Sequence, residues 1–311
     1  MLSTISPAGQ QFVNSINDTQ ARLAIAQQQI GTGLKVSQPS DAPDQISPIL
    51  QLHSSIQQNQ DIQNGLNTAL TKMKAGEGAL SSAVDLLQSA SVIATQATST
   101  NQTAATRATL ASSVQALMEQ MVAASGTTVG GRYVFSGDQD GTPSYQLNLA
   151  SPTGTGVDRL QTAAATGLVQ GSGGARYSTA LSGNVIFDHR NADDSPAPDN
   201  AFAALNGLRV SLLANDSNRI SGSIAGLGTA STYMNNQLAF YGQAESRVTS
   251  DLNQVQTDKL QLQTELTSKT DADMTAAITA LTEGTTQLQA ALSARARMPH
   301  TSLFDVLPMT G

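Results

Sequence analysis

Histidine and acidic side chains are the first candidates for chemistry in this chain. The three histidines, His53, His189 and His300, are scattered along the sequence, and none has a second His or a carboxylate pair at metal-ligand spacing. The run Asp138-Gln139-Asp140-Gly141 has the acidic start of a calcium loop but lacks the later Glu of that motif. We therefore expect surface histidines and a turn, with no metal site.

The segment that follows residue 187 carries four carboxylates: Asp188, Asp193, Asp194 and Asp199. Such a cluster could supply the two acidic groups of a glycosidase. However, the stretch 188–199 contains prolines and no aromatic residue to stack on a sugar, so a solvated loop is the favoured interpretation. The glycine-rich stretches 126–132 and 171–174 are also interpreted as loops, because they lack the ending and the strand-to-helix setting of a phosphate-binding loop. The sequence predicts no catalytic residue and no cofactor site.

The composition favours a structural protein. Only 13% of the 311 residues are charged and 4% are aromatic, with no Trp. A compact enzyme of this length usually draws more of its core energy from aromatic rings, whereas a helical bundle with aliphatic seams does not need them. The net charge of −7 argues against binding to nucleic acid or to an anionic membrane, because either partner requires a basic face. The absence of cysteine excludes disulfides and thiolate metal sites.

Neither a conventional signal peptide nor a membrane span is expected. Residues 1–16 contain no Lys or Arg and no continuous apolar stretch. Nowhere does an apolar run reach the roughly 18 residues that a spanning helix requires. If the protein leaves the cell, its export must depend on a different signal.

The elements that would carry any function are helices. The first apolar seam consists of Phe12, Ile16, Leu23 and Ile30, with Thr19 and Ala26 between them. This 4-3-4-3-4 spacing predicts a helix that packs on another helix. The pattern stops at 31–33, and the break at 38–43 predicts Ser40 or Asp41 as the cap of the next helix.

A second seam keeps one heptad register over residues 49–94. Gly65, Gly76 and Gly78 each weaken that helix by about 1 kcal/mol relative to Ala, so packing must supply its stability. A third helix is expected to pack through Leu110, Val114, Leu117, Met121 and Ala124.

The middle of the chain changes character. Residues 126–174 are rich in Gly, Thr and Ser, which predicts a hairpin near 131–145 followed by loops, and 183–188 reads as a further strand. A short helix is expected at 201–213. A second long seam follows: Met234, Leu238, Tyr241, Glu245, Val248, Leu252, Val255, Lys259, Leu262 and Leu266. The register shifts at 269–273, where the helix is expected to bend or to rotate its face.

The predicted fold is mainly α: an elongated antiparallel helical bundle or coiled coil built from the N- and C-terminal segments, with a small β-rich inserted outer domain. Residues 45–140 and 196–297 would form the bundle core, and residues 141–195 the outer domain. Residues 1–44 and the tail 298–311 have too little apolar mass to be stable alone and are expected to order on assembly.

Every seam can serve either as a core within one subunit or as a contact between subunits. The long central seams can satisfy each other within the chain, whereas the terminal seams favour an assembly interface. The predicted interface residues are Phe12, Ile16, Leu23, Ile30, Met274, Ile278, Leu281, Leu288, Leu292, Leu303, Phe304 and Leu307.

Several motifs resemble those of a known family. They are Gly33-Leu34-Lys35-Val36, Pro39-Ser40-Asp41-Ala42-Pro43, Leu66-Asn67-Thr68-Ala69-Leu70 and Gly76-Glu77-Gly78-Ala79-Leu80. Together they resemble the first turn and second helix of the bacterial flagellin superfamily, and the resemblance covers roughly 1–140 and 195–311. Within that superfamily, the segments 131–137, 271–274 and 302–307 are similar to the hairpin and carboxy terminus of its hook-filament junction subunits.

The resemblance implies a structural subunit of the bacterial flagellum that forms a junction ring, and no enzymatic activity. It implies export through the flagellar type III apparatus without a cleaved signal peptide, and an extracellular location. The implied partners are further copies of the chain, an adjacent hook-associated protein, flagellin and an export chaperone. Filament flagellin is the first alternative, and a secreted coiled-coil adhesin is a more distant one. Polar seam positions are hypothesised to control register: Asn59, Gln63, Glu77, Glu245 and Lys259.

Overall fold

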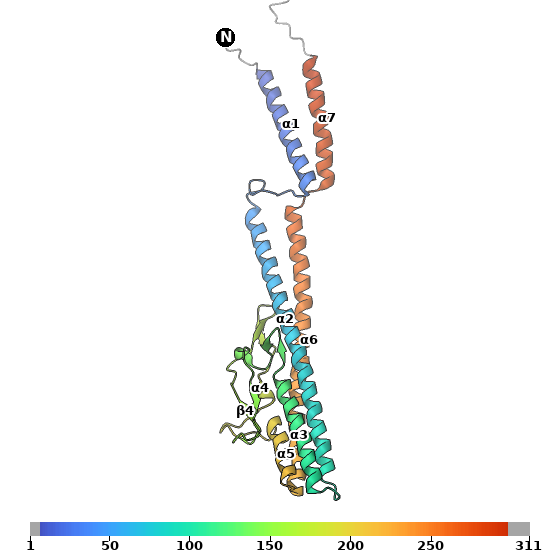
Figure 1. The fold of residues 1–311 in the computed structure, drawn as a ribbon. Helices are drawn as coiled ribbons and strands as arrows, with labels where there is room; N and C mark the ends of the chain where they lie inside the picture. The colour runs from blue at the N-terminus through green and yellow to red at the C-terminus, as the bar shows by residue number, and fades with distance from the viewer. Residues whose placement is uncertain (1–6, 298–311) are drawn as a thin grey trace, which may run out of the picture. The chain divides into compact units, whose positions relative to one another are not determined.

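The computed structural model describes residues 7–297 and divides them into two compact units. The first unit contains residues up to 57 together with those from 259 onward, and the second unit contains residues 58–258. Most of the described residues are helical (Figure 1). The long helices α2 (Ile46–Ala97) and α6 (Ser217–Thr270) contribute to both units.

In the first unit, the helices nearest the two ends of the chain pack on each other. Helix α1 (Pro7–Thr32) lies against α7 (Met274–Ala296). The expectation that the terminal segments lie side by side is confirmed. Small residues dominate the contact, because Ala26 of α1 and Ala277 of α7 are both 3% exposed.

Two short connectors flank this helix pair, one after α1 and one before α7. Backbone hydrogen bonds join the two connectors to each other. Beyond α1, Gly33 adopts a left-handed conformation with φ of +73°, which costs glycine little. Leu34 then forms an antiparallel bridge with Asp271, and the backbone N–H of Lys35 donates to the carbonyl of Thr270 at 2.7 Å. The register shift predicted at 269–273 is therefore the boundary between α6 and α7, where Asp273 caps α7 by accepting from the N–H of Ala276 at 3.0 Å.

The predicted cap at Ser40 or Asp41 is wrong, because α2 begins only at Ile46. Asp41 instead stabilises the connector: its carboxylate accepts from the backbone N–H groups of Gln38 at 2.8 Å and Ser37 at 2.9 Å. These two backbone hydrogen bonds hold the pKa of Asp41 below its ordinary value. The proline-rich break contains a local turn that the sequence pattern did not distinguish from a helix start.

In the second unit, α2 and α6 run antiparallel and side by side, and α3 (Ala104–Ser125) and α5 (Ala201–Leu213) pack together beside them (Figure 1). Thr103 begins α3 with a capping box that it forms with Thr106. Asn200 caps α5, which spans the range expected for it. The continuous helix predicted over 49–94 is confirmed by α2.

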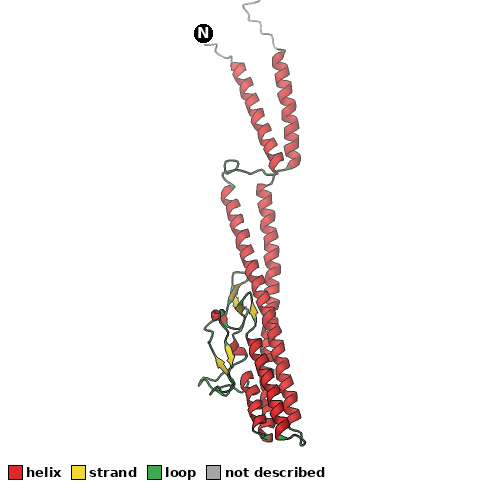
Figure 2. Ribbon diagram, viewed as in Figure 1, coloured by secondary structure: helices red, strands yellow, loops and turns green. Residues whose placement is uncertain are grey.

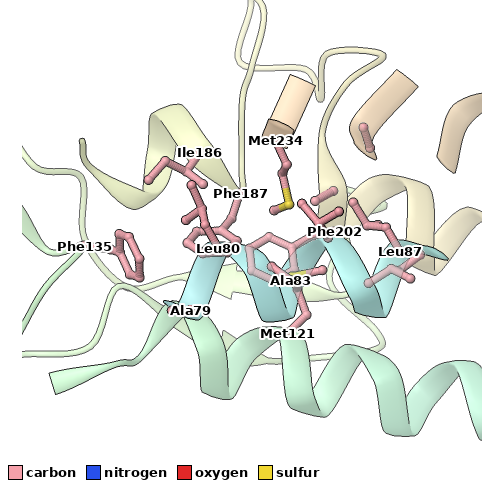
Figure 3. Packing of buried hydrophobic residues seen from close by; sticks show 14 of the residues in the cluster. Ala79, Leu80, Ala83, Leu87, Met121, Phe135, Ile186, Phe187, Phe202 and Met234 are labelled. Carbon is pink, nitrogen blue, oxygen red and sulfur yellow. The ribbon is translucent and has the colours of Figure 1, made fainter. Parts of the chain in front are cut away.

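The core of this unit is formed by aliphatic and Met side chains of the helices and by three buried phenylalanines. Figure 3 shows Leu80 and Leu87 of α2 with Met121 of α3, Phe202 of α5 and Met234 of α6. Phe135 and Phe187 meet edge to face, with ring centroids 5.2 Å apart. The inserted region thus supplies much of the aromatic mass of the core.

Helix α3 buries Val114 and Met121 as predicted, but its buried face is rotated relative to the predicted one. Its buried residues are Arg107, Ala111, Val114, Met118, Met121 and Ser125, whereas Leu110 and Leu117 are half-buried. Arg107 is tolerated there because its guanidinium donates to the carbonyl of Ala97 at 3.0 Å and to Asn215 Oδ1 at 2.6 Å. Those acceptors could not be anticipated from periodicity.

The inserted region holds three separate two-stranded antiparallel hairpins (Figure 2). They pair β1 (Thr128–Val129) with β2 (Arg132–Tyr133), β3 (Tyr145–Leu147) with β4 (Val157–Arg159), and β5 (Leu168–Gln170) with β6 (Arg176–Ser178). The first hairpin begins in the glycine-rich stretch interpreted as a loop, and its second strand, β2, lies within the expected range near 131–145. A short 3₁₀ turn, Gly137–Gln139, follows it. The predicted fold class is confirmed: a mainly helical protein with a small insertion of short hairpins.

The strand predicted at 183–188 is wrong, because this segment forms the short helix α4 (Gly183–Ile186). Ile186 and Phe187 are adjacent and both fully buried. A strand would place neighbouring side chains on opposite faces, whereas a helical turn directs both into the core. The run of apolar residues was the right signal for burial and the wrong one for conformation.

Two glycines of α2 test how tightly the helices pack. A methyl group on Gly76 would lie 3.0 Å from Cε1 of the buried Tyr241, whereas one on Gly78 would meet nothing within 4 Å. We expect Gly76→Ala to destabilise the protein by about 1–3 kcal/mol through overpacking. Gly78→Ala should stabilise it by up to about 1 kcal/mol through helix propensity. Urea denaturation followed by circular dichroism measures both, and equal effects of the two substitutions would contradict the close packing.

Candidate assembly surface

The predicted interface residues of α1 face the neighbouring helix of the same chain. Leu23 is 9% exposed, and Phe12, Ile16 and Ile30 are half-buried. Phe12 also lies near the guanidinium of Arg295, with Cζ 5.8 Å from the ring centroid, a distance within the range of a cation–π contact. Much of this seam is thus used within the subunit.

The predicted residues of α7 divide into two groups. Leu281 and Leu288 are half-buried on the side of α1. Met274, Ile278 and Leu292 are 41%, 52% and 53% exposed, and we call these three residues the exposed α7 strip. Their spacing of four and fourteen residues keeps them on one stripe of the helix, next to the stripe that packs on α1. An apolar stripe of this kind on a single helix is typical of a surface that another helix covers.

Two small residues that sequence reasoning missed set the distance between α1 and α7. Gly284 is buried, and a Cβ added to it would lie 2.8 Å from Leu23 Cδ2. Ala277 is buried one heptad earlier. The recurrence of small residues at 277, 284 and 291 was the available signal. It was overlooked because Ala and Gly were not taken as seam positions in the last helical segment.

The tail residues predicted to join the interface, Leu303, Phe304 and Leu307, lie outside the described residues, and so does His300. Within the described residues, no group of three or more His, Cys, Asp or Glu side chains could hold a metal ion. Among the same residues, no helix is both long and apolar enough to cross a membrane.

Polar seam positions have partners across the α2–α6 pair. Gln63 Nε2 donates to Gln256 Oε1 at 3.3 Å, and Lys74 Nζ lies 3.7 Å from Glu245 Oε1. Asn59 is 8% exposed, and its Oδ1 has no hydrogen-bond partner among the described residues. These contacts are compatible with the hypothesis of register control, which stays a prediction.

The acidic cluster is divided by the fold. Asp188 is fully buried, which contradicts its interpretation as part of a solvated loop. Its carboxylate accepts from Arg159 Nε at 2.7 Å, Arg190 Nε at 3.1 Å and Asn200 Nδ2 at 2.7 Å. Asn200 in turn caps α5. One carboxylate therefore ties strand β4, the loop after α4 and the start of α5 together.

The other three carboxylates of the cluster have separate partners. Asp193 and Asp194 are exposed, and Asp199 Oδ1 lies 2.7 Å from His189 Nδ1. Asp193 accepts from the hydroxyl and backbone N–H of Ser195, and these hydrogen bonds lower its pKa. No two of the four act as a free carboxylate pair, so the arrangement supports a structural role and not acid–base chemistry.

Beside this network, the ring of Tyr145 is buried and its hydroxyl has no hydrogen-bond partner among the described residues. Burial raises the pKa of Tyr145 far above its ordinary value, and the nearby charge of Asp188 raises it further. The phenol therefore stays neutral at physiological pH and contributes to the core mainly through its ring.

Known proteins resemble this chain in both sequence and fold. Residues 6–140 match the bacterial flagellin N-terminal helical region, and residues 224–307 match the bacterial flagellin C-terminal helical region. The chain is 26% identical over 310 residues to flagellar hook-associated protein 3 of Escherichia coli strain K12, and the alignment covers 96% of each chain. The solved structures that share the fold include the following two. A proposed flagellar hook-associated protein of Vibrio parahaemolyticus has a TM-score of 0.63 at 13% identity, covering 74% of this chain and 100% of that one. FlgL of Xanthomonas campestris has a TM-score of 0.57 at 16% identity, covering 70% and 99%.

Proposed function

Because the chain belongs to the bacterial flagellin family, we propose that it is a structural subunit of the bacterial flagellum that joins the hook to the filament. Within the family, the likeness over nearly the whole chain to a hook-associated protein carries this assignment. The role is structural and not enzymatic, and its place is the extracellular flagellum.

The surface proposed for assembly is the α1–α7 helix pair. The contact of Leu23 with Gly284 supports a preformed pair within one subunit, and the exposed α7 strip supports a further helix covering its open side. That helix comes from a neighbouring copy in the junction ring. At 41–53% exposure, these side chains retain much of their apolar surface for burial on assembly.

The proposed partners follow from a position between two tubes. One side of the ring contacts an adjacent hook-associated protein, and the other side contacts the first flagellin subunits. An export chaperone holds the terminal segments before assembly, because isolated amphipathic helices expose apolar surface that promotes aggregation.

Deletion of the gene tests the proposal. We expect hooks without filaments and flagellin released into the medium as monomers, because filament subunits would have no base on which to assemble. A plasmid copy of the gene should restore both filaments and motility. Hooks with intact junctions but no flagellin would make this chain the filament protein, and normal flagella would contradict an essential axial role.

A further inference from the structure

The hairpin β5–β6 is attached to the long helix α6 through one carboxylate. Asp251 of α6 accepts from the backbone N–H of Ser172 at 3.2 Å, from the hydroxyl of Ser172 at 2.6 Å and from the hydroxyl of Tyr177 at 2.6 Å. Ser172 lies in the turn of the hairpin, and Tyr177 lies on β6. A single side chain therefore contacts both the turn and a strand.

Two neighbouring residues fit this attachment. The guanidinium of Arg247, one turn earlier on α6, lies over the ring of Tyr177 with Cζ 3.7 Å from the centroid. At Gly171, an added Cβ would lie 2.7 Å from Asp251 Oδ2. Glycine is needed there because the hairpin backbone approaches the carboxylate so closely.

Strand β5 of the same hairpin reaches α2 through the residue that pairs with Tyr177. Val169 of β5 is 8% exposed, and its Cγ2 lies 3.9 Å from the Cβ position of Gly65. The end of helix α3 lies near Ala75 of α2, since Ala123 and Ala124 of α3 line a hollow together with Ala75. The ten residues between Gly65 and Ala75 correspond to about 15 Å of helix. The hairpin thus bridges α2 and α6 beyond the end of α3.

The charge state of the attachment is stable at neutral pH. Burial raises the pKa of Asp251, but the hydrogen bonds from Ser172 and Tyr177 and the charge of Arg247 outweigh burial and leave the pKa below its ordinary value. Since the unfolded value is about 3.9, the contact contributes stability above that pH and loses it as the pH falls through the lower folded value. Burial, followed by the contact with Asp251, raises the pKa of Tyr177, so its hydroxyl remains a donor at neutral pH.

We infer that hairpin β5–β6 acts as a clasp: it holds α2 against α6 in the region that α3 does not cover. Asp251 is the residue that keeps the clasp closed. Each strand of the hairpin has only three residues, and an isolated hairpin of that size is not stable in water. Its closed position therefore depends on the attachment to α6. The clasp opens as a unit, separately from the region held by Asp188, because the two carboxylates have no partner in common.

Hydrogen exchange measured by mass spectrometry on the full chain tests the clasp. In Asp251→Ala, we expect exchange in 168–178 to rise about tenfold. A smaller rise should occur in the facing segments 62–69 of α2 and 248–255 of α6, and none in 186–205. Tyr177→Phe should give the same pattern more weakly, because it removes one of the three hydrogen bonds and keeps the ring.

Asp258→Asn is the matched control. Asp258 lies one heptad after Asp251 on α6, is half-buried, and among the described residues its carboxylate accepts from Gln254 Nε2 at 2.7 Å and from no atom of the hairpin. This variant should leave exchange in 168–178 unchanged. Faster exchange in 168–178 without any change in α2 would show a surface hairpin that closes nothing and would overturn the inference. Unchanged exchange in 168–178 in Asp251→Ala would overturn it as well.

Discussion

Asp188→Ala is expected to lower the free energy of unfolding by about 3–5 kcal/mol, because it leaves buried cations without their partner. The side chain of Asp188 is fully buried, while those of Arg159 and Arg190 are only 17% and 8% exposed. Both guanidiniums would remain in a low-dielectric region after the substitution. The loss should be measured as a lower urea midpoint by circular dichroism.

The neighbouring carboxylate Asp194 is the matched control. Its side chain is 73% exposed and lies 3.0 Å from Arg190 Nη1 and 3.7 Å from Arg159 Nη1. Because water screens exposed ion pairs, Asp194→Asn should cost less than about 1 kcal/mol, and Asn tolerates the left-handed backbone of this position, where φ is +63°. Equal losses for the two variants would mean that the buried network does not hold the inserted region in place. Asp188→Asn removes the charge but keeps the volume of the side chain, so it separates the effect of lost charge from the effect of lost packing.

The second large effect concerns assembly. The double variant Ile278→Asp, Leu292→Asp is expected to fold normally but to fail in forming the hook-filament junction. Both side chains are about half exposed in the subunit, so substitution there should change its stability by no more than about 0.5 kcal/mol per site. Buried beneath a neighbouring helix, each new carboxylate would cost several kcal/mol, which corresponds to more than a hundredfold loss of affinity.

Complementation of a deletion strain measures this prediction through motility and through flagellin released into the medium. Thr279→Asp is the control, because Thr279 is exposed and adjacent to Ile278 but lies off the exposed α7 strip. We expect the control to restore motility and the double variant to leave flagellin in the medium. Full motility with the double variant would exclude the exposed α7 strip from the interface, and a lowered melting temperature of the purified double variant would indicate a folding defect instead.

Sequence reasoning succeeded where one periodic signal extended over many turns. The two long seams predicted helices α2 and α6. The buried residues Leu66, Leu80 and Val248 lie on these seams. Such a pattern suffices because an apolar stripe at helical spacing has one stable solution, which is burial against another helix. The family motifs at 33–43 and 66–80 lie in these same segments.

Shorter elements required the tertiary structure. The four residues of α4 were read as a strand, because an apolar run of that length does not distinguish a buried turn from a buried strand. Asp188 was read as solvated, because nothing in its local sequence shows that Arg159, far along the chain, would neutralise it. Gly76 was read only as a weak point of α2, although its missing side chain makes room for Tyr241.

The sequence alone determined that this protein is helical, without cysteine, acidic and related to axial proteins of the flagellum, since these properties depend on composition, period and local motifs. The tertiary structure decided which side of each helix is buried within the subunit. On α7 it placed Leu281 and Leu288 toward α1 and left Ile278 open, a division that depends on the close approach of Leu23 to Gly284. Distances between segments remote in the chain follow from packing, and a one-dimensional pattern does not contain them.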